Sequence, residues 1–187
     1  MDMYNNRVMY PYWGQQIYAN PQSQYYWWIS RENNHLKAIA YINGGPLAPD
    51  IRGNVKFEEE SNGTKVTVEV SGLPPYHPGT EGSNPIGPHG FHIHQNGNCE
   101  VGSPDNPFQA AGEHWNPANQ PHGNHPGDFP VLFSNNGYAK MCFYTNKFKP
   151  AEAIGKSIII HQNPDDYRTQ PAGDAGKRLA CGIIQAV

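Results

Sequence analysis

The stretch from Gly90 to Asp128 constrains the fold of this chain most strongly, because it carries a dense set of potential metal ligands. These ligands are His92, His94, His114, His122, His125 and Asp128. Imidazole is the commonest metal ligand in proteins, and histidines clustered at this spacing usually indicate a bound transition metal. The fold must therefore bring side chains from an otherwise Gly- and Pro-rich stretch to one place.

Two of these histidines alternate with apolar residues in the sequence Gly-Phe-His-Ile-His, which runs from Gly90 to His94. Successive side chains of a β-strand point to opposite faces, so His92 and His94 would share one face and the two apolar residues the other. The apolar pair could then enter a core while both imidazoles approach one ion. A His-x-His pair alone is weak evidence, since exposed strands often contain one by chance.

The remaining ligands complete two different sets. One set lies within a single loop and consists of His114, His122, His125 and Asp128. Its three nitrogens and one carboxylate form a closed tetrahedral set that is typical of structural zinc. The other set gains His161, which ends the short apolar segment that begins at Ser157. An all-histidine site of His161 with His92 and His94 suits copper, which prefers nitrogen donors.

The rest of the chain predicts an all-β fold. Three valines alternate with polar residues at 65–70, and Asn62 followed by Gly63 favours a hairpin turn before them. Short strands separated by turn residues are expected at 36–42, 51–58, 64–70, 89–95, 130–133, 137–144, 157–161 and 179–186. Eight such strands indicate a β-sandwich or β-barrel. Two long loops, 96–129 and 162–177, would form the walls of the metal site.

Residues 1–34 differ in composition from residues 35–187, which would form the metal-binding domain. The first segment holds three of the four tryptophans and six of the eleven tyrosines, mixed with Asn and Gln. It has no clear period of a helix or a strand, so no element is expected there. Two interpretations stay open: a flexible arm that lays some aromatic side chains on the domain, or an assembly segment.

Charge and hydropathy exclude some classes of partner. The formal net charge is −3 at pH 7, so nucleic acid is not an expected partner. No apolar run approaches the roughly 20 residues that span a bilayer, so no membrane span is expected. We recognise no secretory signal either. The expected location is therefore the cytoplasm or a non-classical one, for example a cell or spore surface layer.

Four motifs together resemble the copper/zinc superoxide dismutases of bacterial type. They are Gly90-Phe-His-Ile-His94, Ala111-Gly-x-His-x-Asn-Pro117, His125-x-Gly-Asp128 and Gly173-Asp-Ala-Gly-Lys-Arg-Leu-Ala-Cys-Gly182. The resemblance covers roughly 35–187, with 1–34 as an unusual extension, and it implies an eight-stranded Greek-key β-barrel. The gap between His122 and His125 is shorter than in animal enzymes of the family, and that between Cys99 and His114 is longer.

The resemblance implies an antioxidant enzyme that dismutates the superoxide anion to oxygen and hydrogen peroxide. His114 would bridge copper and zinc as an imidazolate and act in catalysis, and Arg178 would guide the anion to copper. Asp165 would connect a copper histidine to a zinc histidine, and Cys99 would form a disulfide with Cys181. The implied ligand sets are His92, His94, His114 and His161 for copper, and His114, His122, His125 and Asp128 for zinc.

A second class of function stays open beside the enzyme. The same fold could belong to a non-enzymatic zinc- or copper-binding protein, or to a structural protein of a coat or assembly. His161 together with His92 and His94 discriminates between them, because a zinc-only protein does not need this trio. Members of the resembled family are often dimers, so a homodimer is a further expectation.

Overall fold

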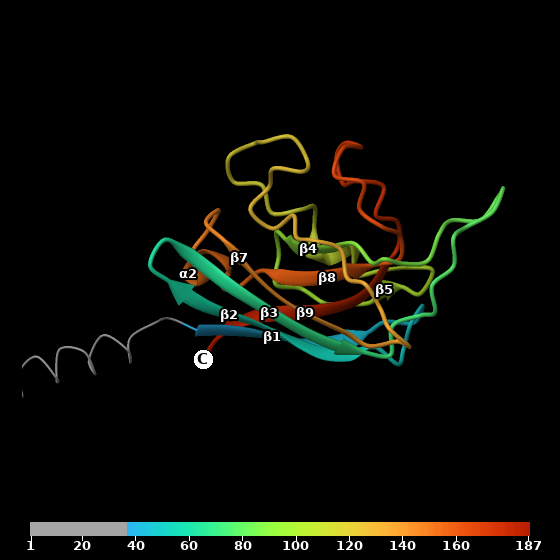
Figure 1. The fold of residues 1–187 in the computed structure, drawn as a ribbon, viewed down its shortest axis with the longest axis horizontal. Helices are drawn as coiled ribbons and strands as arrows, with labels where there is room; N and C mark the ends of the chain where they lie inside the picture. The colour runs from blue at the N-terminus through green and yellow to red at the C-terminus, as the bar shows by residue number, and fades with distance from the viewer. Residues whose placement is uncertain (1–36) are drawn as a thin grey trace, which may run out of the picture. The chain divides into compact units, whose positions relative to one another are not determined.

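A computed structural model describes residues 37–187, and the extension expected at 1–34 lies outside the described residues. The described chain is built on one curled antiparallel sheet of seven strands (Figure 1). In the order β4-β8-β9-β1-β2-β3-β7, its strands are Phe91–His94, Ser157–His161, Arg178–Ala186, Lys37–Gly44, Arg52–Glu60, Gly63–Ser71 and Ala139–Thr145. Smaller elements are β5 (Gly102–Ser103), β6 (Asn106–Pro107), η1 (Gln109–Ala111) and α2 (Pro150–Ala153).

Alternating side chains explain why one face of this sheet forms the core. In β3, Val66, Val68 and Val70 are buried, whereas the residues between them are partly exposed. A turn at Ser61 and Asn62, one residue before the expected Asn62–Gly63, joins β2 to β3 in a hairpin whose register places Val55 opposite Val68. The core therefore lies on the concave side of the sheet, as the sequence pattern predicts.

Three long connections carry the chain between the two edges of the sheet. After β3 the chain passes to β4 at the opposite edge, returns in β7 beside β3, and then crosses again to β8 beside β4. Crossings of this kind between sequential antiparallel strands define a Greek-key arrangement. The predicted all-β Greek-key fold is confirmed.

The segment expected as a strand at 130–133 is the main departure from the predicted elements. It forms one isolated bridge, in which Leu132 and His89 exchange backbone hydrogen bonds of 2.9 Å. Pro130 has no N–H group to donate, which limits the ladder that this segment can form. Nearby backbone groups still cover the outer edge of β4, because Ile93 donates to Gly127 O at 3.1 Å and Trp115 donates to Ile93 O at 2.9 Å.

A disulfide ties the long connection after β4 to the last strand. Cys99 and Cys181 are bonded, with Cα atoms 5.6 Å apart, so the predicted pair is confirmed. The loop expected at 96–129 is also less open than the sequence suggests, because it contains β5, β6 and η1. A disulfide typically stabilises a domain by about 2–4 kcal/mol, and more when it closes a longer loop.

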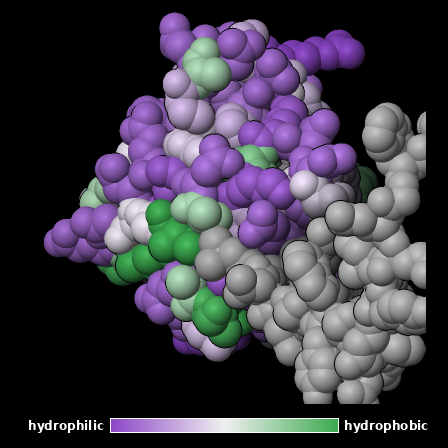
Figure 2. Space-filling view, turned by 90° about the vertical axis from the view of Figure 1, so that its left-hand side faces the viewer, coloured by the Kyte–Doolittle hydropathy of each residue, from purple (hydrophilic) through white to green (hydrophobic). Residues whose placement is uncertain are grey.

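The face of the described domain seen in Figure 2 is mostly hydrophilic. Figure 2 views the side that lies at the left of Figure 1, where hydrophobic residues gather in a small group among hydrophilic ones. The large exposed apolar side chains include Tyr41 on β1 and Phe133. None of the helices within 37–187 has the length and apolar character needed to cross a lipid bilayer.

Candidate metal centre

Strand β4 presents its two histidines to one face and its two apolar residues to the other. All four side chains are buried, and Phe91 and Ile93 belong to the hydrophobic core. His92 and His94 lie on the opposite face, beneath the loops that leave the sheet. The alternation in the sequence thus places two imidazoles outside the core and still away from water.

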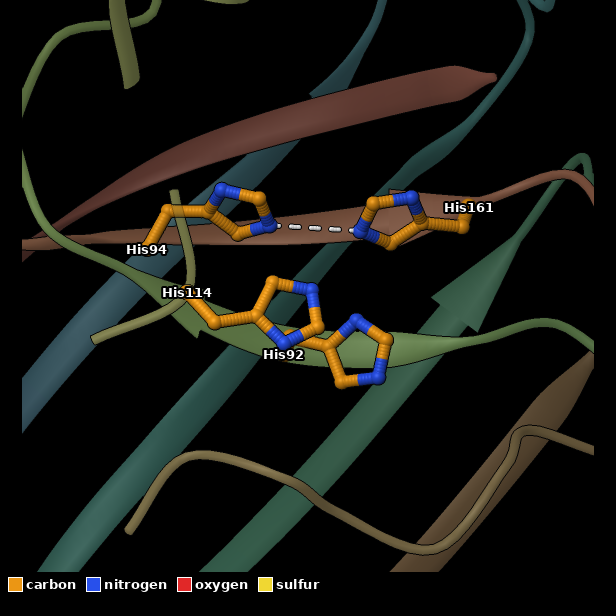
Figure 3. A group of neighbouring side chains, drawn as sticks. All are labelled: His92, His94, His114 and His161. Carbon is orange, nitrogen blue, oxygen red and sulfur yellow. Dashed lines mark hydrogen bonds between the residues drawn. The ribbon is translucent and has the colours of Figure 1, made fainter. Parts of the chain in front are cut away.

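The first group of side chains is the four-histidine cluster, formed by His92, His94, His114 and His161. Each contributes one nitrogen, and these four nitrogens lie within 4.8 Å of one another. Figure 3 shows His94 and His161 facing each other, with Nε2 atoms 3.2 Å apart and the other two rings beside them. The structure therefore brings His161, far along the chain, to the two histidines of β4.

Backbone carbonyls determine which ring nitrogens of this cluster are free. His94 Nδ1 lies 2.9 Å from Gly112 O, and His161 Nδ1 lies 3.3 Å from Gly176 O. Because a carbonyl oxygen only accepts, both Nδ1 atoms carry the proton, and both Nε2 atoms present lone pairs. Two lone pairs that face each other at 3.2 Å repel, and a cation between them would remove that repulsion.

Burial keeps three of these imidazoles neutral, namely those of His92, His94 and His161. It lowers the pKa of His161 to about 3, with a further contribution from nearby His114. Burial also lowers the pKa of His92 and of His94 well below the ordinary value, and neighbouring histidines add to both effects. A neutral imidazole is the form that binds a metal, so the cluster is ready to bind at physiological pH.

The second group is the aspartate cluster, formed by His114, His122, His125 and Asp128, whose ligand atoms also lie within 4.8 Å of one another. Asp128 Oδ1 is 3.2 Å from His114 Nδ1 and 3.1 Å from His125 Nδ1. Burial raises the pKa of the Asp128 carboxyl, but the three surrounding histidines lower it more, so its net pKa lies below the ordinary value. The carboxylate is therefore ionised and available as a ligand.

His114 belongs to both clusters. Its Nδ1 faces Asp128, and its Nε2 is buried without a hydrogen-bond partner. Its ring centroid lies 4.0 Å from that of His92 and 5.7 Å from that of His125. One imidazole thus presents a nitrogen to each cluster, as the family resemblance implies.

Asp165 connects the two clusters through the ring nitrogens that point away from them. Its Oδ2 accepts a hydrogen bond from His92 Nε2 at 2.6 Å, and its Oδ1 accepts one from His122 Nε2 at 2.9 Å. Since Asp165 engages Nε2 of both rings, the Nδ1 atoms of both point toward the clusters. The backbone N–H of Tyr167 also donates to Oδ1, at 2.7 Å.

Three buried ring nitrogens without hydrogen-bond partners indicate whether these residues fit metal ions. They are His92 Nδ1, His114 Nε2 and His122 Nδ1. A buried polar atom without a partner costs about 1–3 kcal/mol, so three in one place require an explanation. A nitrogen-rich set suits copper, and three nitrogens with one carboxylate suit zinc, so both clusters fit these ions.

Arg178 lies beside the four-histidine cluster at a small cavity. The cavity has a volume of about 280 Å³, and His94, His161, Glu113 and Arg178 are among its lining residues. The guanidinium donates to Phe108 O and to Gly112 O, both at 2.7 Å. Burial lowers the pKa of Arg178, and the negative charge of Glu113 raises it. An anion that enters this cavity meets a fixed cation beside the histidines.

Sequence reasoning missed one set of contacts at this centre. The side chain of Gln170 makes two hydrogen bonds to the backbone of His122. No spacing or residue pattern indicates such a contact, because an isolated glutamine in a loop usually faces solvent.

Comparisons with known proteins agree with this geometry. The sequence matches the family model described as copper/zinc superoxide dismutase over residues 51–184. A Cu-Zn superoxide dismutase of Deinococcus radiodurans is 39% identical over an alignment of 155 positions, which covers 73% of this chain and 79% of that protein. A Cu-Zn superoxide dismutase of Caulobacter vibrioides is 35% identical over an alignment of 150 positions, which covers 71% of this chain and 78% of that protein.

A solved structure extends the likeness to the fold. The Cu/Zn superoxide dismutase from Brucella abortus matches with a TM-score of 0.64 and 29% sequence identity. The match covers 79% of this chain and 98% of that chain.

Proposed function

The chain belongs to the copper/zinc superoxide dismutase family, and we propose that the four-histidine cluster holds its copper and the aspartate cluster its zinc. The protein converts the superoxide anion to oxygen and hydrogen peroxide with these two cofactors. The findings give no support to the alternative of a non-enzymatic metal-binding or coat protein. What remains to be assigned is the task of each side chain.

The strongest support for the copper assignment is the pair of opposed Nε2 atoms on His94 and His161. Both lone pairs converge on one point, and the free nitrogens of His92 and His114 lie within 4.8 Å of them. When bound there, copper supplies the one-electron oxidation and reduction that dismutation requires. The protein side chains hold the ion in a site that is screened from water by their burial.

The aspartate cluster has a different task. Its donors form a closed set of three nitrogens and one ionised carboxylate, which suits an ion with no redox role. His114 is the shared member, and its Nε2 is the atom at which the chain would hold and return a proton during the cycle. Asp165 would keep the rings of His92 and His122 in the orientation that ligation requires.

Arg178 would attract the substrate and orient it. Its guanidinium is fixed by two backbone carbonyls, so it presents its remaining N–H groups to the cavity in a constant direction. A fixed cation in the lining of a small cavity raises the encounter rate of a small anion, and salt weakens the effect. Arg178 and His114 are thus the two catalytic residues of the proposal.

Domain limits and partners complete the proposal. Residues 35–187 would form the catalytic domain and 1–34 an extension, which agrees with a family match that begins at residue 51. A second copy of the chain would be a partner, and light scattering on the purified protein tests this homodimer. Nucleic acid would not bind because the net charge is −3, and a gel-shift assay with DNA and RNA tests this expectation.

Metal analysis combined with a superoxide-consumption assay tests the central assignment. After loading, we expect one copper and one zinc per chain and activity that depends on copper. Replacing His125 should remove zinc, and replacing His161 should remove copper. Copper that remains stoichiometric in a His161→Ala variant would contradict the proposed copper ligands, even if the parent protein is active.

A further inference from the structure

Gln170 holds the backbone of His122 on both sides. Its Oε1 accepts a hydrogen bond from His122 N at 2.7 Å, and its Nε2 donates to His122 O at 3.3 Å. His122 lies outside any strand or helix. Among the described residues, Gln170 is the partner of both the N–H and the C=O group of His122. The hydrogen bonds of the backbone of this residue therefore depend on one glutamine side chain.

The loop that carries Gln170 is itself well anchored. Asp166 Oδ1 accepts from the backbone N–H groups of Arg168 at 2.9 Å and Thr169 at 2.8 Å. Gly173 N donates to Thr169 O at 2.7 Å, which closes a tight turn around Gln170. The Nε2 group of Gln170 also donates to Arg168 O at 3.1 Å. These hydrogen bonds hold the side-chain amide of Gln170 in place independently of its contacts with His122.

The same loop fixes the ring of His122 through Asp165, whose Oδ1 accepts from His122 Nε2. Gly173 leaves the space for this bond, because a Cβ atom at that position would collide with both partners. The loop at 162–177 thus holds His122 at two points: the ring through Asp165 and the backbone through Gln170. Two points of attachment determine both the position of the residue and the direction of its Nδ1.

We propose that Gln170 is a positioning residue for His122, and that through it the loop at 162–177 sets the affinity of the aspartate cluster for zinc. The inference rests on the proposed assignment of His122 to zinc. It deepens that assignment, because it makes the affinity depend on a residue that touches neither ion. The same loop lines the cavity beside Arg178 with Ala172 and Ala175, so zinc binding and the cavity wall share one support.

The test compares three variants. Gln170→Met keeps the length of the side chain and removes both hydrogen bonds, whereas Gln170→Glu keeps the acceptor for His122 N and removes the donor. Gln185→Met is the matched control, because it places the same substitution on exposed β9, away from the site. Gln170 is itself exposed, so neither substitution at this position disturbs the core.

Zinc affinity, measured by competition with a chromophoric chelator, is the main observable. We expect Gln170→Met to lose about tenfold in zinc affinity, the lower end for a lost outer partner of a ligand. Gln170→Glu should lie between this variant and the parent protein, and Gln185→Met should equal the parent. Copper affinity should change by less than about twofold, since the four-histidine cluster keeps its contacts. Cobalt(II) bound in place of zinc should show altered visible absorption in Gln170→Met only.

Two results would overturn the inference. One is a zinc affinity of Gln170→Met within about twofold of the parent, and the other is an equal loss of copper and zinc affinity, which indicates general loosening. Failure of the underlying assignment has a different signature. In that case His122→Ala retains zinc as well as the parent does, whatever the Gln170 variants show.

Discussion

The proposed copper side and the proposed zinc side of this centre are built from different kinds of structure. His92, His94 and His161 belong to β4 and β8, which are hydrogen-bonded neighbours in the sheet. His122, His125 and Asp128 come from a loop segment outside the strands and helices, in which only Asp128 forms an isolated bridge, with His92. Strand ligands are positioned by backbone pairing, and loop ligands depend on hydrogen bonds that other segments supply. The two sides should therefore respond differently to the same kind of substitution.

The largest expected effects come from removing one ligand on each side. His161→Ala should lose copper and reduce superoxide consumption by more than about 100-fold, beyond the range for outer partners of a ligand. The zinc content should persist, because the aspartate cluster keeps all its members. His125→Ala is the converse variant and should lose zinc while copper still binds. Metal analysis of both proteins checks this, and loss of both ions in either variant would break the distinction.

Asp165→Ala should affect both sides at once, because its carboxylate contacts His92 and His122. We expect a loss of about 10–100-fold in affinity for both metals or in activity, as is typical when an outer partner of a ligand is removed. The ring N–H groups left unpaired would also destabilise the metal-free domain by about 1–3 kcal/mol each. Metal titrations and urea unfolding measure these effects. If this variant kept the metal content and the rate of the parent protein, Asp165 would have no role at the metal centre.

Arg178→Ile should lower the rate without changing metal content. The cavity would lose its fixed cation, so the rate constant for superoxide should fall by about tenfold at low salt, within the range of electrostatic steering. The dependence of the rate on ionic strength should also flatten. Lys177→Ile is the control, because Lys177 is the exposed neighbour and the same charge is lost. An unchanged salt dependence in Arg178→Ile would contradict the assigned role.

The contrast between strands and loops also explains which features the sequence predicts. His92 and His94 follow from alternation, and a short apolar segment that ends in His161 is recognisable as a strand, so the copper side is predictable from local patterns. Segment 130–133 has the composition of a strand, but its pairing is limited to one bridge. Pro130 already indicates locally that its ladder is limited, whereas its pairing with His89 does not follow from local pattern because the two segments lie far apart in the chain.

The zinc side is predictable in its ligands but not in its supports. Spacing and residue type identify His114, His122, His125 and Asp128, and the family resemblance adds Asp165. The contact of Gln170 with the backbone of His122 spans 48 residues and uses an ordinary side chain. Such a contact depends on how two loops pack, and neither composition nor periodicity carries that information.

The smallest expected effect concerns Glu113. It lines the same cavity as Arg178 and carries the opposite charge. Its carboxylate reduces the attraction that the guanidinium exerts on an anion, so Glu113→Gln should raise the rate at low salt by about twofold, a modest gain because Glu113 is exposed. The gain should vanish at high salt, and metal content should stay unchanged. Glu81→Gln, which removes an exposed carboxylate outside the cavity, is the control. An equal gain in both variants would mean that net charge, rather than the local field of the cavity, governs the encounter with superoxide.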